Sequence, residues 1–215
     1  MKEQINWREI VGATEISQLK RVADFLIEES KKQDEVLKKK GKEWERMHDG
    51  GEEYQGYTKK EWDGLQLGEE TYEIECFQQI LFRSFISTVF AFIEHDLKEL
   101  CNQLQKMSEQ KFSLRDMKGN GMYACLTYLD RILEHDFMLG DADIRVCRHI
   151  RNALDHGDTK LSKERQSNLQ KNLKGSNFKI DFHNDEIYFE KEHVYIFIQF
   201  ADKVWKAISN QWIVR

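Results

Sequence analysis

The sequence predicts a mainly α-helical fold: a helical bundle with a long N-terminal helix and one small β-hairpin before the last helix. Three observations carry this prediction. Apolar residues recur at three- and four-residue steps through several long segments, as on one face of a helix. None of the 215 residues is proline, so nothing forces a break in these helices. A stretch that alternates apolar and polar residues surrounds Asn184-Asp185 and is typical of a hairpin.

The helices are expected in order along the chain. The periodic segments run over residues 15–47, 72–107, 122–135, 142–156, 162–173 and 193–213, and the hairpin over 178–190. Residues 48–64 hold four glycines and many polar side chains, which predicts a long surface loop. Asp141 or Asp143 is placed to cap the helix that starts near residue 142, and Gly157 is suited to end it.

The length suits one domain with an elaborated arm. Residues 1–70 are expected to form a helical arm and a polar loop, packed on the same domain as the helical residues 71–215. The segment "KKQDEVLKKKGKEWERM" mixes both signs of charge, which favours a solvated arm over a basic RNA-binding arm. The net charge of −5 argues against a protein that coats polyanions generally, but it leaves room for a local nucleic-acid site.

Three features point to a reducing cytoplasm and away from a membrane. The four cysteines, Cys76, Cys101, Cys125 and Cys147, are too far apart for a zinc knuckle or a CxxC pair, and their apolar surroundings predict buried free thiols. The start of the chain lacks the apolar region of a signal peptide. The most apolar run, near Leu81–Ile93, contains an arginine and a serine and is expected to be too short and too polar to cross a bilayer.

The stretch "RNALDHGD", residues 151–158, is the candidate site. On a helical projection at about 100° per residue, one stripe is apolar and faces the core: Val146, Ile150, Ala153 and Leu154. The opposite face is polar: Arg148, Arg151, Asn152, Asp155 and His156. Arg151 and His156 stand roughly 140° apart on this projection. Two copies of the helix that meet across a two-fold axis would bring an arginine and a histidine from each chain into one shared cleft.

Such a cleft suits RNA cleavage by the adjacent 2′-hydroxyl. Histidine exchanges protons near neutral pH, and a helix C-terminus beside His156 favours its protonated form. Arginine grips phosphate and stabilises charge that develops on the phosphorus. This chemistry requires neither a metal nor another cofactor.

The stretch "RNALDH" resembles the R-x4-6-H signature of the HEPN superfamily. Arg151 and His156 match the two signature positions, and Asn152 matches the polar residue after the arginine. The order of a long aromatic-rich helix ("FRSFISTVFAFIEHDLKELC"), a second helix and a short helix that ends in the motif is similar to the HEPN helical core. The resemblance covers residues 72–157, and 190–213 more loosely.

Many HEPN proteins are metal-independent endoribonucleases that act as dimers, either as toxins paired with antitoxins or in antiphage defence. Others have lost catalysis and bind RNA or assemble complexes. The resemblance therefore implies an RNA substrate, a homodimer with a composite active site, and an antitoxin or defence partner protein. Its catalytic residues would be Arg151, His156 and Asn152. One toxin subgroup has a tyrosine two residues after the histidine, where this chain has Asp158, so control by modification of that tyrosine is unsupported.

Each candidate also has a plain structural interpretation. Arg151 and Asp155 are spaced for a surface ion pair, and His156 would then only cap its helix. Arg148 is expected either to bind phosphate or to be solvated, and Arg145 and His149 are weaker candidates. Glu94 is a candidate polar neighbour of the cleft or a surface carboxylate. The two "EHD" segments, 94–96 and 134–136, lack the spacing of helical metal sites, so no metal site is expected. A helical structural protein with a chance motif is the remaining alternative.

Overall fold

The computed structural model describes residues 13–47, 56–107, 112–117, 119, 121–134, 140–155 and 160–213. Within them the fold is mainly helical with one two-stranded hairpin, as predicted. The helices are α2 (Ala13–Glu45), α3 (Lys59–Met107), α4 (Gly121–Leu133), α5 (Ala142–Asp155), α6 (Lys163–Leu173) and α7 (Lys191–Ile213), with a 3₁₀ turn η1 (Leu114–Asp116) before α4. The strands β1 (Asp181–His183) and β2 (Glu186–Tyr188) lie between α6 and α7.

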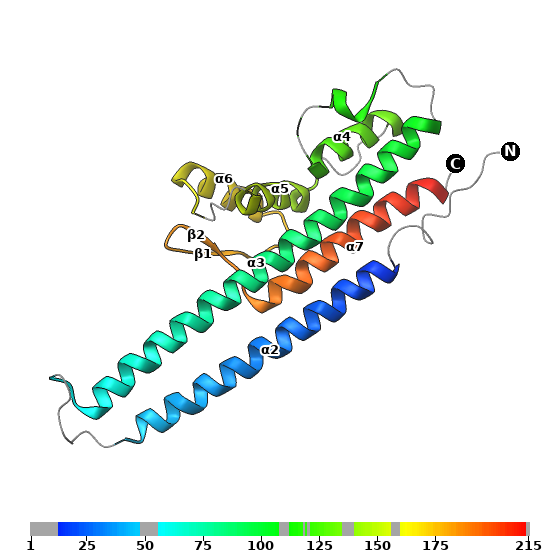
Figure 1. The fold of residues 1–215 in the computed structure, drawn as a ribbon. Helices are drawn as coiled ribbons and strands as arrows, with labels where there is room; N and C mark the ends of the chain where they lie inside the picture. Colours follow the sequence, from blue (N-terminus) through cyan, green and yellow to red (C-terminus); the bar gives the residue numbers. More distant parts are fainter. Residues whose placement is uncertain are drawn as a thin grey trace.

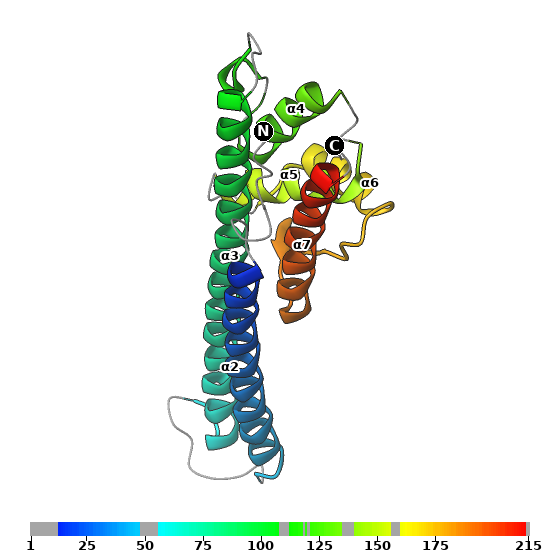
Figure 2. The same cartoon turned by 90° about the vertical axis from the view of Figure 1, so that its right-hand side faces the viewer.

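The helix α3 is the axis of the molecule. Helices α2 and α7 lie along it and contact each other, while α4 and α5 pack against it, with α6 packed on α5 (Figure 1). The C-terminal half of α2 and the N-terminal half of α3 extend beyond the other elements as a two-helix arm (Figure 2). In this arm the indole Nε1 of Trp44 donates a hydrogen bond to the carbonyl oxygen of Lys60 at 2.8 Å.

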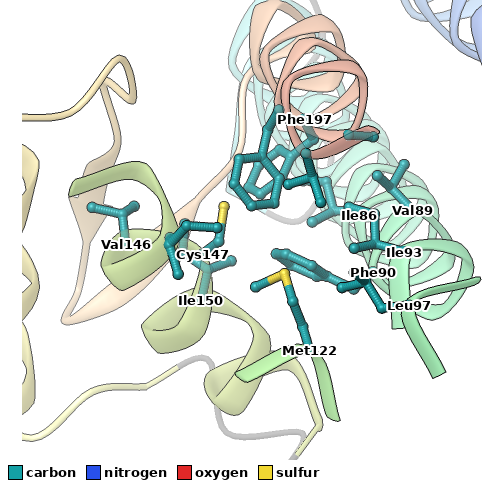
Figure 3. Close-up of a cluster of buried hydrophobic side chains, with 14 of the residues drawn as sticks. Ile86, Val89, Phe90, Ile93, Leu97, Met122, Val146, Cys147, Ile150 and Phe197 are labelled. Carbon is teal, nitrogen blue, oxygen red and sulfur yellow. The ribbon is translucent and has the colours of Figure 1, made fainter. Parts of the chain in front are cut away.

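The core lies where α3, α4, α5 and α7 meet. Figure 3 shows Cys147 and Ile150 of α5 pointing toward Phe90 of α3, with Phe197 of α7 nearby and Val146 of α5 farther from Phe90. All five of these side chains are buried. Burial of each large apolar side chain contributes about 1.5–3 kcal/mol, so this cluster fixes how α5 sits on α3.

The predicted loop over 48–64 is wrong in its last residues, because α3 begins at Lys59 rather than near 72. The helix starts at this point because Thr58 and Glu61 form a capping box. The prediction relied on the four glycines of residues 48–64 and overlooked it. The backbone N–H of Thr58 donates to Oε2 of Glu61 at 2.8 Å, and the backbone N–H of Glu61 approaches the Thr58 hydroxyl at 3.3 Å. Residues 48–55 lie outside the described residues.

The apolar residues of 72–107 predict a buried stripe on this helix, and that prediction is partly wrong. The predicted stripe is Phe77, Leu81, Phe85, Val89 or Thr88, Phe92, Leu97, Leu100 and Leu104. Phe85, Val89, Leu97, Leu100 and Leu104 are buried as expected, but Phe77 is 49% exposed. The buried face is completed by side chains that the stripe left out: Gln79, Phe82, Ile86, Phe90, Ile93 and Cys101. The stripe failed because α3 is apolar around much of its circumference, so periodicity alone did not select the buried face.

By length and composition alone, α3 contains a stretch apolar enough to cross a membrane, with a mean hydropathy of 1.4 over 18 residues. This differs from the expectation drawn from its arginine and serine. Of that stretch, 39% is buried within the fold, and a core helix reaches the same hydropathy.

Two smaller predictions are also revised. Cys101, Cys125 and Cys147 are buried free thiols as expected, but Cys76 is exposed on α3. The hairpin is confirmed around its turn, where Asn184 and Asp185 both have positive φ angles, of 51° and 66°. Such a pair of φ angles matches the right-handed twist of the flanking strands. Its strands are shorter than the predicted range 178–190.

Candidate functional site

The helix α5 begins at a side-chain cap. Oδ1 of Asp141 accepts hydrogen bonds from the backbone N–H groups of Asp143 at 2.9 Å and Ile144 at 3.4 Å. Of the two aspartates predicted as possible caps, Asp141 therefore has this role.

Asp143 instead anchors α5 to the rest of the fold. Its side chain is buried, and its oxygens accept hydrogen bonds from Lys203 Nζ at 2.7 Å and from the backbone and side-chain nitrogens of Asn177 at 2.7 and 2.8 Å. Burial raises the pKa of this carboxyl, but the hydrogen bonds from Lys203 and Asn177 outweigh it and leave the pKa below its usual value. The anchor fixes the start of the helix that carries the candidate residues.

The two faces of α5 follow the predicted division. Val146, Ile150 and Ala153 are buried, and Leu154 packs partly buried against the core. Arg148, Asn152 and Asp155 are exposed, and Arg151 is half-buried. The sequence thus separates the polar residues of the motif from the buried stripe of α5.

Arg151 is held between two carboxylates. Its Nη2 donates to Oε2 of Glu94 at 2.9 Å, its Nε donates to the other oxygen of the same carboxylate, and its Nη1 forms an ion pair with Asp155. The side chains of Arg151 and Glu94 are 27% and 18% exposed, against 42% for Asp155. The contact with Glu94 is therefore the better shielded and has the two-point geometry that orients a guanidinium.

The same carboxylate lies against the first residue of α4. Gly121 has a φ of +57°, and a Cβ atom there would overlap both carboxylate oxygens of Glu94. Glycine is needed at this position for both reasons. Glu94 thus connects α3 with the start of α4 and the last turn of α5.

Arg148 lies on an aromatic ring. The guanidinium carbon of Arg148 is 4.5 Å from the ring centroid of Tyr123 on α4, a cation–π distance. This contact orients an exposed arginine toward the same side as Arg151. The sequence did not indicate a role for Tyr123, because its partner Arg148 belongs to another helix.

His149 and Arg145 hold α6 in place. The side-chain amide of Asn172 donates to His149 Nε2 at 3.3 Å, and Arg145 Nε donates to Asn172 Oδ1 at 3.1 Å. Burial, followed by the charge of Arg148, lowers the pKa of His149. The neutral ring is the form that accepts this hydrogen bond, so both residues have structural partners.

The remaining predicted residues are placed only in part. Asn152 is exposed one residue after Arg151. His156, Gly157 and Asp158 lie outside the described residues, as do His135 and Asp136 of the second "EHD" segment. In the part of the chain that the structure describes, no three histidine, cysteine, aspartate or glutamate side chains are grouped to hold a metal ion.

Comparisons of the chain with family models, with curated proteins and with solved structures find no match.

Proposed function

We propose that the protein is a metal-independent endoribonuclease of the HEPN type, which cleaves RNA through attack by the adjacent 2′-hydroxyl. The observation that carries the proposal is the placement of Arg151, half-buried on the polar face of α5 and oriented by Glu94. An arginine held in this way is preorganised to stabilise negative charge at one point, which is the electrostatic requirement of phosphoryl chemistry.

The two carboxylates around Arg151 have different roles in this proposal. Glu94 is shielded and holds the Nε–Nη2 edge, so it is a positioning residue. Asp155 is exposed and one helical turn away, and such surface pairs contribute little to stability. A phosphate group would displace Asp155 and bind the Nη1 edge, while Glu94 keeps the guanidinium in place.

The other residues of the motif complete the proposed chemistry. His156 follows the last described residue of α5 and would move the proton between the 2′-hydroxyl and the leaving oxygen. Asn152 would orient the phosphate, and Arg148 would bind a neighbouring one. We place the complete cleft between two copies of the chain, with a toxin or antiphage role and an antitoxin or defence protein as the regulating partner.

A binding module without catalysis is the second candidate, and one observation favours it. The charge of Arg151 is balanced by two carboxylates in a chain whose net charge is −5. A protein of this second kind would hold RNA or another protein at the α5 face and leave it uncut.

The test is cleavage of RNA by the purified protein in the presence of EDTA. We expect products that end in a 2′,3′-cyclic phosphate, and rates about 10²–10⁴-fold lower for His156→Ala, the range for loss of a general acid–base group. Arg151→Ala is expected to lose a similar share of activity, and Arg165→Ala on α6, an exposed arginine, serves as the control. RNA that binds but stays intact supports the module. Cleavage that persists in both motif variants contradicts the proposed site.

A further inference from the structure

A cavity separate from the candidate site lies between α3 and the hairpin. Its volume is about 400 Å³, within the range of small-molecule sites. The hairpin side is held to α3 by Gln79, whose amide nitrogen donates to the carbonyl oxygen of Phe189 at 2.7 Å and whose oxygen accepts from the Phe189 N–H at 3.0 Å. The cavity is thus bounded by elements with fixed relative positions.

Three ring side chains, those of Tyr72, His183 and Tyr188, line the cavity. On the hairpin, the rings of His183 and Tyr188 lie with their centroids 4.4 Å apart. On α3, Tyr72 lines the cavity although its side chain is 68% exposed, and Ile80 beside it is 59% exposed. Exposed apolar side chains around an open cavity are the usual setting for a planar ligand that stacks.

The charges in the cavity disfavour an anion. Arg83 is the cation of the lining, but its Nη2 already donates to Oε2 of Glu186 at 3.2 Å and to the carbonyl oxygen of Ile187 at 3.3 Å. Glu75 adds a second carboxylate. The Nε–H of Arg83 is buried without a hydrogen-bond partner. The buried position keeps this nitrogen out of reach of a ligand, so the ring side chains are the groups left to bind one.

The cavity and the candidate site share one face of α3. Arg83 precedes Glu94 by 11 residues and Cys76 precedes it by 18, close to three and five full helical turns, so the three residues align along roughly 27 Å. The chain also links the two places. Beyond the end of α5, Lys160 bridges to Glu186, and the backbone N–H of Leu161 donates to the carbonyl oxygen of Asp185 at 2.8 Å.

We propose that this cavity binds one base of a single-stranded RNA whose backbone runs along α3 to Arg151. The base would stack on Tyr72 and on the His183–Tyr188 pair. Every base has an aromatic face, so stacking captures single strands with little dependence on sequence. The inference rests on the proposed ribonuclease function for the identity of the ligand, and it adds a subsite away from the cleavage point.

Cys76 provides a direct readout. It lines the cavity and is exposed, whereas the other three cysteines are buried, so iodoacetamide should alkylate Cys76 first. We expect a short 2′-O-methyl oligoribonucleotide of mixed sequence, which cannot be cleaved, to slow this alkylation. Tyr72→Ala should weaken both the protection and the affinity, measured by fluorescence anisotropy, by about five- to 150-fold, the value of one base stack. Phe25→Ala, which removes an aromatic side chain of 65% exposure on α2, is the matched control and should change neither.

The outcomes separate this inference from the ribonuclease proposal. Oligonucleotide that binds without protecting Cys76, or equal affinities for Tyr72→Ala and the control, overturns the base pocket even if the protein cleaves RNA. If the oligonucleotide protects Cys76 in the wild type but not in Tyr72→Ala, and the protein cuts no RNA, the base pocket is supported and the catalytic proposal is wrong. A protein that does not bind the oligonucleotide overturns both.

Discussion

The carboxylate of Glu94 accepts hydrogen bonds from two nitrogens of the Arg151 guanidinium and joins the C-terminal third of α3 to the C-terminal part of α5. The two residues are 57 positions apart in the chain. Their contact is more shielded than the ion pair between Arg151 and its neighbour Asp155. Long-range polar contacts of this kind set the position of a side chain, because neither partner can move without leaving the other unpaired.

Replacing Glu94 is expected to destabilise the fold. Glu94→Ala leaves a half-buried guanidinium with one exposed partner, so we expect the free energy of unfolding to fall by about 1–2 kcal/mol, at the lower end for hydrogen bonds to charged groups. Glu94→Gln keeps an acceptor oxygen and should lose less. Urea unfolding at neutral pH measures both. Glu99→Ala, at an exposed position on the same helix, should stay within about 0.5 kcal/mol of the wild type. Equal stabilities for Glu94→Ala and Glu99→Ala would show that the contact does not support the fold.

Two glycines should respond to alanine with opposite signs. Gly121→Ala forces a side chain onto a φ of +57° and displaces the Glu94 carboxylate, so we expect a loss of about 1–3 kcal/mol. Gly68 lies inside α3 with open space around it, and Gly68→Ala should raise stability by about 0.5–1 kcal/mol through helix propensity. Thermal unfolding of both variants gives the signs directly. A stabilising Gly121→Ala contradicts the described start of α4.

Because of Asp143, the free energy of unfolding is expected to decrease at acid pH. Its folded-state pKa lies below the unfolded value of about 3.9, so between the two values the unfolded chain binds more protons and stability falls as pH falls. Asp143→Asn has one acceptor oxygen where three donors converge, and should lose about 2–3 kcal/mol at pH 7. The gap to the wild type should narrow below pH about 4. Asp181→Asn, at an exposed strand position, is the control, and a gap that does not change with pH would contradict the assigned role of Asp143.

Most elements of the fold could be predicted because their signals are local. The apolar residues of 193–213, for example, are spaced for a helix with one side toward the core, and the sequence predicts Val194, Phe197, Ile198, Ala201, Val204, Trp205 and Ile208 on that side. The first six of these are buried. The start of α3 was missed because the four glycines of residues 48–64 suggested a loop. The last of them, Gly64, packs against the ring of Trp44, with Nε1 3.0 Å from an ideal Cβ. That contact joins two helices and has no local signature.

The candidate site was predictable only as a list of residue types. Periodicity placed Arg148 and Arg151 on the polar face of α5, and both lie there. The sequence offered Glu94 as a candidate polar neighbour of the cleft, but it did not show that Glu94 orients Arg151. It did not indicate Tyr123, since Glu94 and Tyr123 belong to other helices, α3 and α4. Distances between such elements depend on how the helices pack, which one sequence does not specify.

Arg148 is expected to contribute to RNA binding through both the charge and the planar shape of its guanidinium group. Arg148→Ala should weaken binding of a single-stranded RNA and reduce the slope of log affinity against log salt by about 0.7, the value for one phosphate contact. Arg148→Lys should restore the slope but not the full affinity, because an ammonium does not stack on Tyr123 as a guanidinium does. Lys38→Ala, which removes an exposed charge from the arm, is the control. A slope that is equal in Arg148→Ala and wild type excludes a phosphate contact at this residue.

The composite cleft can be tested by mixing two inactive chains. The polar face of α5 carries Arg151 toward α3 and α4, and Arg151 and His156 are five residues apart, so we expect the working pair to come from opposite copies. Arg151→Ala and His156→Ala should each be inactive alone. In the mixed dimer, an intact arginine from one chain meets an intact histidine from the other, so ribonuclease activity should rise above the sum of the two separate preparations. Sedimentation of differently tagged chains confirms that the dimers exchange. No rise despite exchange, or a wild type that stays monomeric at micromolar concentration, means that a single chain holds the whole site.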